Sequence, residues 1–407
     1  MTNEVKNVPE IRFPEFSGEW EENKLNNYLK TSKIKNTQKK YNKQDVLSVS
    51  GDFGIVNQIE FQGRSFAGAS VAPYGIVETG DIVYTKSPLK SNPYGIIKVN
   101  KGETGIVSTL YAIYKIKKNV NANFVEYYFT NDLRLNKYLK PLVNKGAKND
   151  MKVSDDNALI GNVIFPKYIE EQIKISKFFS KLDQQIELEE KKLELLEQQK
   201  KGYMQKLFSQ ELRFKDENGY GFPNWRYNYL ENYIIPYDEK TTENNQYPVL
   251  TSSREGLFLQ KDYFTRDVAS KDNTGYNVVP YGYFTYRHMS DDLIFKFNIN
   301  YIVQKGIVST LYPVFKTTND LDNYFLKEIL NNGNEFKKYA LMQKQGGSRT
   351  YMYFSKLKKL KLHIPVLEEQ QKIGDFLVKI DKLIENQSKK IDFLKQRKQG
   401  LLQKMFV

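Results

Sequence analysis

The chain has 407 residues, which is more than one ordinary domain holds and fits two or three domains. Hydrophobic residues make up 40%, enough to build cores, and no apolar run approaches the roughly 20 residues that cross a bilayer. There is no cysteine, which excludes a disulfide framework and a thiolate metal site, and the first ten residues lack the apolar core of a signal peptide. The composition therefore predicts a cytoplasmic protein with no membrane partner.

The net charge of +14 favours a polyanionic partner, most simply nucleic acid. A richness in Lys, Asn, Tyr and Ile can raise the isoelectric point by itself, so charge alone does not decide the partner. The distribution of charge is more informative. Acidic and basic side chains cancel over 170–208 and nearly cancel over 368–407, so most of the positive charge lies on the remaining segments.

The first segment, 1–165, is predicted to fold as mixed strands rich in Tyr, Ile and Val, separated by Gly, Asn and Pro turns. One strand is predicted at 81–84, and an amphipathic helix containing Phe124 and Val125 follows the string GIVSTLY at 105–111. Lys, Arg, Asn and Ser in polar loops can reach base edges and phosphates, although each loop could equally be an ordinary solvated one. The candidate nucleic-acid contacts of this segment are Arg64, Ser65, Lys86, Ser87, Lys90, Asn92, Lys145, Lys148 and Asn149.

A long helix is predicted within the segment 166–210, with Pro166 a few residues before its start. Apolar residues recur there at the a and d positions of five heptads, which is typical of a coiled coil. At 1.5 Å per residue, the 39 residues 170–208 would form a helix about 58 Å long, longer than a surface helix of one small domain needs. The apolar residues assigned to this face are Ile175, Phe179, Leu182, Ile186, Leu193 and Leu196.

The segment 211–364 has the same strand-rich character, with a strand predicted at 283–286 and an amphipathic helix that includes Phe325 and Ile329. Its candidate contacts with nucleic acid are Ser252, Ser253, Arg254, Arg287, His288, Lys344, Gly347, Ser348, Arg349 and Tyr351. A second long helix is predicted over 365–407, after Pro365. Its coiled-coil residues are Ile373, Leu377, Ile380, Ile384, Ile391 and Leu394.

The two halves are copies of one another. GIVSTLY at 105–111 returns at 306–312, and Glu-Ile-Arg-Phe at 10–13 returns as Glu-Leu-Arg-Phe at 211–214. The long helix at 170–208 matches 368–406 with 19 of 39 positions identical, whereas 25–100 and 230–300 align poorly. A common frame with variable contents is expected of two reading domains with different targets, and drift after duplication is the simpler alternative.

The polar interruptions of the heptads also match, since Glu189 corresponds to Gln387 and Lys200 to Lys398. The continuation of the first helix is Glu211 onwards, and the equivalent piece for the second helix lies at the N-terminus, at Glu10. We therefore expect the two helices to form an antiparallel pair within one chain, with a pseudo-two-fold axis through it. Separate oligomerisation seams are the alternative. The fold class predicted from these features is α+β, with two globular domains of mixed strands and helices joined by two long helices.

The layout resembles the specificity subunit of type I restriction–modification systems. The residues that carry the resemblance are PEIRFPEFSGEW at the start, EEQIKISKFFSKLDQQIE after Pro166 and EEQQKIGDFLVKIDKLIE after Pro365. The resemblance implies two target-recognition domains, each reading one half of a split site in double-stranded DNA, with the helices setting the unread gap. The loop at 145–148 lacks the Ser that the family often has beside its Gly, so its contacts are less certain than those of 347–349.

The same resemblance implies the partners and cofactors of the chain. Two modification subunits would carry S-adenosylmethionine and the adenine methylation chemistry, and restriction subunits would use ATP and Mg²⁺. No cofactor is then expected in this chain, and no catalytic residue or metal ligand is assigned to it.

Two other functions compete with DNA recognition. A stand-alone adenine methyltransferase would need an Asn-Pro-Pro-aromatic turn, and the nearest string is Ser91-Asn92-Pro93-Tyr94. A nuclease would need clustered carboxylates around a metal, and the doublets 155–156 and 291–292 are more often solvated turns. The alternative to these enzymes is a structural coiled-coil adaptor whose basic domains bind another anion. It predicts no sequence preference for DNA.

Overall fold

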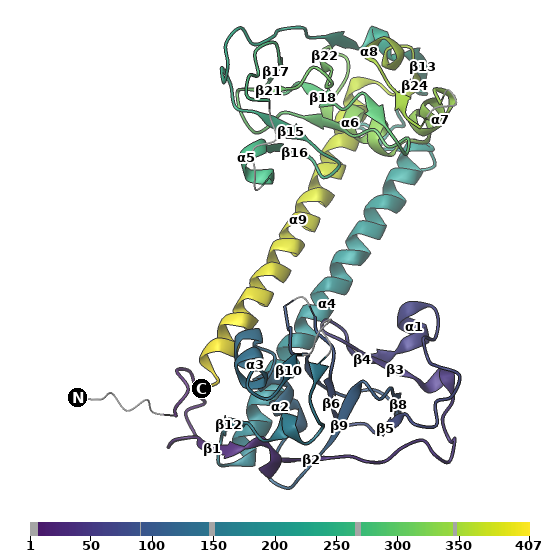
Figure 1. Ribbon diagram of the computed structural model, residues 1–407. Coiled ribbons are helices and arrows are strands. Elements are labelled where there is room, and N and C mark those ends of the chain that lie inside the picture. Colours follow the sequence, from purple (N-terminus) through teal and green to yellow (C-terminus); the bar gives the residue numbers. More distant parts are fainter. Residues whose placement is uncertain (1–6, 90, 146–150, 265–269, 345–347) are drawn as a thin grey trace, which may run out of the picture. The chain divides into compact units, whose positions relative to one another are not determined.

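The computed structural model describes residues 7–89, 91–145, 151–264, 270–344 and 348–407 (Figure 1). The chain divides into two compact units: unit 1 comprises 1–190 with 389–407, and unit 2 comprises 191–388. Both are mixed assemblies of short strands and helices, which confirms the predicted α+β class. Each unit contains part of both long helices, so the compact units differ from the domain limits expected from the sequence, and the boundaries at 165 and 364 stay predictions.

Unit 1 is built around a four-stranded antiparallel sheet in the order β2-β9-β6-β7, with two-stranded ladders beside it. The ladders are β1-β12, β3-β4, β5-β8 and β10-β11. The elements are β1 (Glu21–Lys24), β2 (Leu29–Thr31), β3 (Leu47–Ser50), β4 (Gly54–Asn57), α1 (Gln58–Gln62), β5 (Gly75–Val77), β6 (Ile82–Thr85), β7 (Ile97–Val99), β8 (Gly105–Val107), β9 (Tyr111–Ile116), α2 (Ala122–Tyr128), α3 (Asp132–Leu139), β10 (Asn144–Lys145), β11 (Met151–Lys152), β12 (Asn162–Phe165) and α4 (Ile169–Phe208).

Unit 2 repeats the arrangement with the sheet β14-β22-β18-β20 and the ladders β13-β24, β15-β16, β17-β21 and β19-β23. Its elements are β13 (Arg226–Tyr229), β14 (Ile234–Pro236), β15 (Leu250–Ser252), β16 (Leu257–Leu259), α5 (Gln260–Tyr263), β17 (Asn277–Pro280), β18 (Phe284–Tyr286), β19 (Met289–Ser290), β20 (Phe297–Ile299), β21 (Lys305–Val308), β22 (Val314–Thr317), α6 (Asn323–Asn332), α7 (Asn334–Met342), β23 (Thr350–Tyr351), α8 (Phe354–Leu357), β24 (Lys361–Ile364) and α9 (Leu367–Lys404).

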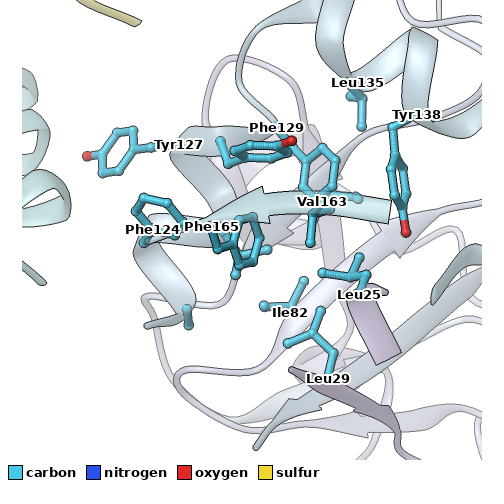
Figure 2. Close-up of a cluster of buried hydrophobic side chains, with 14 of the residues drawn as sticks. Leu25, Leu29, Ile82, Phe124, Tyr127, Phe129, Leu135, Tyr138, Val163 and Phe165 are labelled. Atoms are coloured by element: carbon cyan, nitrogen blue, oxygen red, sulfur yellow. The ribbon is translucent and has the colours of Figure 1, made fainter. Parts of the chain in front are cut away.

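The core of unit 1 is formed by the sheet, helices α2 and α3, and the start of α4. Figure 2 shows part of it, with side chains from β6 (Ile82), α2 (Phe124) and α3 (Leu135). Phe124 on α2 and Phe165 on β12 are fully buried, with their rings edge to face at 5.1 Å. The end of α9 enters the same core, where Phe406 stacks on Phe179 of α4 at 5.8 Å. Burial of this much aromatic surface is the main favourable term for the unit. The predicted helix after GIVSTLY is confirmed as α2, and its counterpart as α6.

The repeated string GIVSTLY forms β8 and the turn into β9 in unit 1, and β21 and the turn into β22 in unit 2. Its glycine is required by close packing. A Cβ on Gly105 would lie 2.6 Å from the backbone oxygen of Asp45, and one on Gly306 would lie 2.4 Å from Leu250 Cδ1. Only glycine allows the strand to approach this closely.

The EEQ strings at the helix starts anchor each unit through buried polar side chains. Gln172 accepts a hydrogen bond from the backbone N–H of Asn121 at 3.0 Å and donates to the Pro166 carbonyl at 3.3 Å. Gln370 accepts from the N–H of Asp322 at 2.8 Å and donates to the Pro365 carbonyl at 2.9 Å. Each glutamine thus ties the start of a long helix to the start of α2 or α6, which fixes the direction in which the helix leaves the domain.

Within each unit the two long helices pack antiparallel. In unit 1, Leu182 and Ile186 of α4 meet Leu394 of α9, and Lys398 pairs with Asp183 at 2.5 Å. In unit 2, Lys200 pairs with Asp381 at 2.6 Å. The two matched lysines are therefore satisfied by matched aspartates, as expected of polar residues that fix register.

All twelve predicted coiled-coil residues are buried or half-buried. Nine are buried, and the half-buried ones are Leu193, Leu196 and Ile384. Ile175 and Phe179 also belong to the globular core of unit 1, and Ile373 and Leu377 to that of unit 2. The first two heptads of each helix thus build the domains as well as the helical pair.

The contacts after the two long helices agree with the expectation that the N-terminal segment is the continuation equivalent to Glu211 onwards. The N–H of Leu212 donates to the Lys206 carbonyl at 3.0 Å, directly after α4. At the equivalent place after α9, the N–H of Ile11 donates to the Lys404 carbonyl at 2.9 Å. The N-terminal segment therefore docks on the end of α9 as residues 211–214 dock on the end of α4.

Candidate nucleic-acid interface

In unit 2 the structure brings together candidate residues from three separate segments at one end of strand β18. Arg287 and His288 follow β18 directly, and the loop that precedes α8 is bonded to them. Met352 donates its N–H to the His288 carbonyl at 2.7 Å, and Tyr286 donates its hydroxyl to the Met352 carbonyl at 2.9 Å. The short ladder β19-β23 continues this contact by pairing Ser290 with Thr350.

The third segment is the β15-β16 hairpin. Buried Asn298 on β20 donates to the Ser252 hydroxyl and to the Ser253 carbonyl, both at 2.9 Å. The Ser253 hydroxyl also accepts from the N–H of Glu255 at 3.1 Å and so closes the turn. Ser252 and Ser253 are therefore half-buried parts of the hairpin, and their effect is to hold Arg254 outward at its tip.

An acidic doublet joins the hairpin and the loop. Arg254 donates through Nη2 to Asp292 at 2.8 Å, and Arg349 donates through Nε to the neighbouring Asp291 at 2.9 Å. Asp292 also accepts from the Ser290 hydroxyl at 2.9 Å, and this bond, with smaller help from Ile294 and Arg254, lowers the pKa of the carboxyl. The sequence placed this doublet in an ordinary solvated turn. The structure shows that it positions two arginines.

A hollow of about 160 Å³ lies among these residues, lined by Arg254, Arg287, Lys296, Asp291, Ser290 and Tyr312 among others. Lys296 is half-buried, and burial lowers the pKa of its ammonium group, an effect partly opposed by Glu328. The lining is mostly polar and carries three cationic side chains beside one carboxylate. Such a surface suits an anionic or hydrogen-bonding ligand that binds from the solvent side.

Three aromatic rings lie beside the arginines. His288 stacks on Tyr353 at 4.9 Å, and Tyr353 stacks on Tyr351 at 5.6 Å with the rings 11° apart. Tyr353, which the sequence did not single out, is 47% exposed and forms the accessible part of the stack. The His288 ring is buried and its Nδ1 lies 2.5 Å from the Leu311 carbonyl, so its role is to support the tyrosines.

The corresponding place in unit 1 is built differently. Lys86 follows β6, as the Arg287-His288 pair follows β18, and its N–H donates to the Leu110 carbonyl at 2.9 Å. Its ammonium group pairs with Asp155 at 2.8 Å, and Tyr114 donates to the Asp155 carbonyl at 2.9 Å. Here the loop ahead of the proline forms its own ladder, β10-β11, instead of pairing with the segment after β6.

Asn92 does not fit an interface. Its side chain is buried and donates to Asp132 at 2.9 Å, which ties the loop after β6 to the start of α3. The DNA contact predicted at Asn92 stays a prediction, and the burial of this side chain does not favour it.

Arg64 and Ser65 lie just beyond α1. The guanidinium of Arg64 lies over the Phe66 ring, 4.6 Å from its centroid, and Gln58 accepts from the N–H of Phe66 at 2.7 Å. Arg64 is exposed and Ser65 half-buried. Two more exposed rings, Phe53 and Phe61, contact each other at 5.3 Å on the same hairpin and helix.

For the remaining candidate residues the structure gives at most the exposure of the side chain. Ser87 is half-buried, and Lys344 and Ser348 are exposed. Lys90, Lys148, Asn149 and Gly347, with the side chain of Lys145, lie outside the described residues. Within the described ranges no group of His, Asp and Glu side chains could hold a metal ion, and no helix has the length and apolarity that a bilayer crossing requires.

Comparison with known proteins gives the family. The model of the type I restriction modification DNA specificity domain matches residues 204–396, which include all of the unit 2 site. Residues 204–396 belong to this family. The match confirms the resemblance predicted from the sequence. Specificity subunits of type I systems are DNA-recognition subunits without catalytic chemistry, as expected for this chain.

Individual relatives are distant. A protein named as a type I restriction enzyme MjaX specificity subunit, from Methanocaldococcus jannaschii, is 30% identical over 88 residues, 22% of this chain and 21% of that protein. The match thus spans only about a fifth of the relative's length.

Two solved structures share the fold over almost the whole chain. The S subunit of a type I restriction–modification system from M. genitalium is 13% identical, with a TM-score of 0.54 over 98% of this chain and 99% of that one. A chain from a structure on complex assembly and conformational transition of a type I system is 14% identical, with a TM-score of 0.55 over 95% and 97%. At these identities the likeness concerns the fold.

Proposed function

We propose that this chain directs a type I restriction–modification complex to a bipartite site in double-stranded DNA. Each unit reads one half of the site, and the paired helices fix the gap between the halves. The observation that carries the proposal is a repeated frame with unlike contents. The anchors at Glu171 and Glu369 recur, while the residues at the ends of β6 and β18 differ.

Such a repeated frame with unlike contents would let two similar domains recognise two different DNA sequences. In unit 2 the reading surface combines Arg254, Arg287 and Arg349 with an exposed tyrosine stack, and arginine and aromatic side chains suit base edges and phosphates. In unit 1 it would contain Lys86 and Arg64. The net charge of +14 would supply the attraction to the phosphate backbone that does not depend on sequence.

The partners follow from the same proposal. Two modification subunits would carry S-adenosylmethionine and methylate adenine, and restriction subunits would use ATP and Mg²⁺. This chain would hold no cofactor itself and would act in the cytoplasm, where the DNA lies.

A selection from randomised DNA, made with the full chain in complex with its modification subunits, tests the proposal. Two short specific blocks separated by a constant unread gap are expected. Exchange of residues 1–165 for those of a related chain should change one block and leave the other. Recovery of DNA with no sequence preference would favour the rival adaptor, and methyl transfer by the chain alone would favour the rival enzyme.

A further inference from the structure

Arg349 is an exposed cation of unit 2 whose guanidinium is held by a carboxylate. It stands directly before β23, whose residue Thr350 is buried and paired with Ser290 of β19. Asp291, its carboxylate partner, stands directly after β19. The β19-β23 ladder therefore brings the backbones of Arg349 and Asp291 together, and the 2.9 Å bond from Nε to Oδ1 then orients the guanidinium.

The atom that makes this bond decides what the rest of the group can do. Because Nε is engaged with Asp291, both terminal NH₂ groups of Arg349 are left without a hydrogen-bond partner among the described residues. These two groups form the planar fork that matches two adjacent acceptors. In the major groove, guanine offers such a pair, N7 and O6, whereas adenine replaces O6 by a donor.

Arg254 differs in this respect. It meets Asp292 through the terminal Nη2, so one of its four terminal N–H donors is already engaged. The two arginines of this cluster therefore differ in role. Arg349 has both terminal NH₂ groups available for a ligand, whereas Arg254 supplies a positive charge near the surface.

The ion pair itself adds little to folding. Arg349 and Asp291 are 52% and 68% exposed, and exposed ion pairs usually contribute little to stability because water and salt screen them. A pair that is held by a ladder but contributes little to folding is better explained by orientation of the arginine for a ligand.

We propose that Arg349 recognises a guanine in the half-site of unit 2 by donating both terminal NH₂ groups to N7 and O6. Asp291 is its positioning residue, since it fixes the plane of the guanidinium. This inference rests on the proposed function, because it presumes that unit 2 lies in the major groove of its half-site.

The test compares variants of the full chain in complex with its modification subunits. Arg349→Ala and Arg349→Lys should each lose the preference for guanine at a single position of one block, by roughly five- to hundredfold, while the other positions stay as they were. Lysine keeps the charge but lacks the fork. Arg226→Ala, which removes another exposed arginine of unit 2, is the matched control and should leave the selected sequence unchanged.

A second measurement uses modified DNA. Replacing that guanine by 7-deazaguanine removes the N7 acceptor, so binding by the unmodified protein should weaken and binding by Arg349→Ala should not weaken further. Asp291→Asn should reduce the discrimination between guanine and 7-deazaguanine without changing the salt dependence of binding, since it leaves the number of phosphate contacts unchanged.

The outcomes separate the two proposals. If the unmodified protein selects a bipartite site and Arg349→Lys still selects the same bases, Arg349 contacts a phosphate and the inference is overturned, while the proposed function stands. If the unmodified protein selects no sequence at all, the proposed function fails and the inference fails with it.

Discussion

The guanidinium of Arg12 donates two hydrogen bonds to the carboxylate of Glu171, from Nε at 2.7 Å and from Nη2 at 2.8 Å. Trp20 donates its indole N–H to the same carboxylate at 3.3 Å. Unit 2 repeats the arrangement, since Arg213 and Trp225 both donate to Glu369. Both glutamates are completely buried. The second glutamate of each EEQ string is thus the point at which the N-terminal segment of a unit is fixed to its long helix.

We expect Glu171→Ala to destabilise unit 1 by about 3 kcal/mol. The substitution leaves the charge of Arg12 without its partner and the indole N–H of Trp20 without an acceptor. This loss of unfolding free energy is at the lower end of what breaking a buried ion pair costs, because Arg12 keeps its hydrogen bond to the Gly18 carbonyl. Urea unfolding of the full chain, followed by tryptophan fluorescence, measures the change. Glu170→Ala alters the exposed neighbouring glutamate and is the control. Equal losses in the two variants would contradict the role of Glu171.

Gly105→Ala should destabilise unit 1 by about 1–3 kcal/mol, since the added methyl group would meet the backbone oxygen of Asp45 at 2.6 Å and Leu47 at 2.8 Å. The matched control is Gly51→Ala, where a Cβ meets nothing within 4 Å and the backbone is not left-handed. Thermal unfolding of the two variants gives the comparison. A stable Gly105→Ala protein would show that β8 can move away from the turn at Asp45.

Several buried tyrosines make the protein sensitive to alkali. Burial is the largest cause that raises the pKa of Tyr114, Tyr138 and Tyr286 above the usual value near 10. A raised native pKa means that the folded state keeps protons which the unfolded state loses above about pH 10. The stability from these tyrosines is therefore present below that pH and is lost as the pH rises through the native pKa values.

The measurement is the free energy of unfolding from about pH 8 to about pH 11, together with phenolate absorbance. We expect the free energy to fall above about pH 10 and the buried phenols to ionise only as the protein unfolds. Tyr138→Phe, which removes one such group and its bond to the Ala158 carbonyl, should flatten the dependence. A free energy that stays constant across this window would refute the argument.

The gap between the two DNA blocks should follow helix length if the helices act as a spacer. Along the chain, the limits of the units fall between Glu190 and Lys191 on α4 and between Ser388 and Lys389 on α9. Four residues inserted at both places lengthen each helix by about 6 Å and leave the contacts within each unit in register. We expect the gap in the selected DNA to grow by one or two base pairs, at roughly 3.4 Å per pair. An unchanged gap would reject the spacer role.

The order of elements and the repeated frame could be predicted from the sequence because they rest on local patterns. Heptad spacing predicted the buried faces of α4 and α9, and the duplicated strings predicted that the two halves of the chain share one frame. Periodicity of apolar residues reports directly on which face of a helix is buried, so these predictions need no knowledge of the tertiary fold.

The candidate site could be predicted only in part. Arg254, Arg287 and Arg349 were selected as polar loop residues, yet loop composition cannot tell which loops meet or which side chains turn inward. Asn92 was selected on the same grounds and is buried against Asp132, whereas Asp291 and Asp292 were dismissed and each hold an arginine.

By itself, the sequence determined that the chain is a duplicated α+β protein with two long helices and positive charge on its globular parts. Only the tertiary structure decided which charges are presented and how. The ladder β19-β23 and the bonds from Asn298 to the β15-β16 hairpin join segments that lie 45 to 62 residues apart. Such contacts depend on three-dimensional closure of the domain, and the orientation of Arg349 by Asp291 follows from that closure.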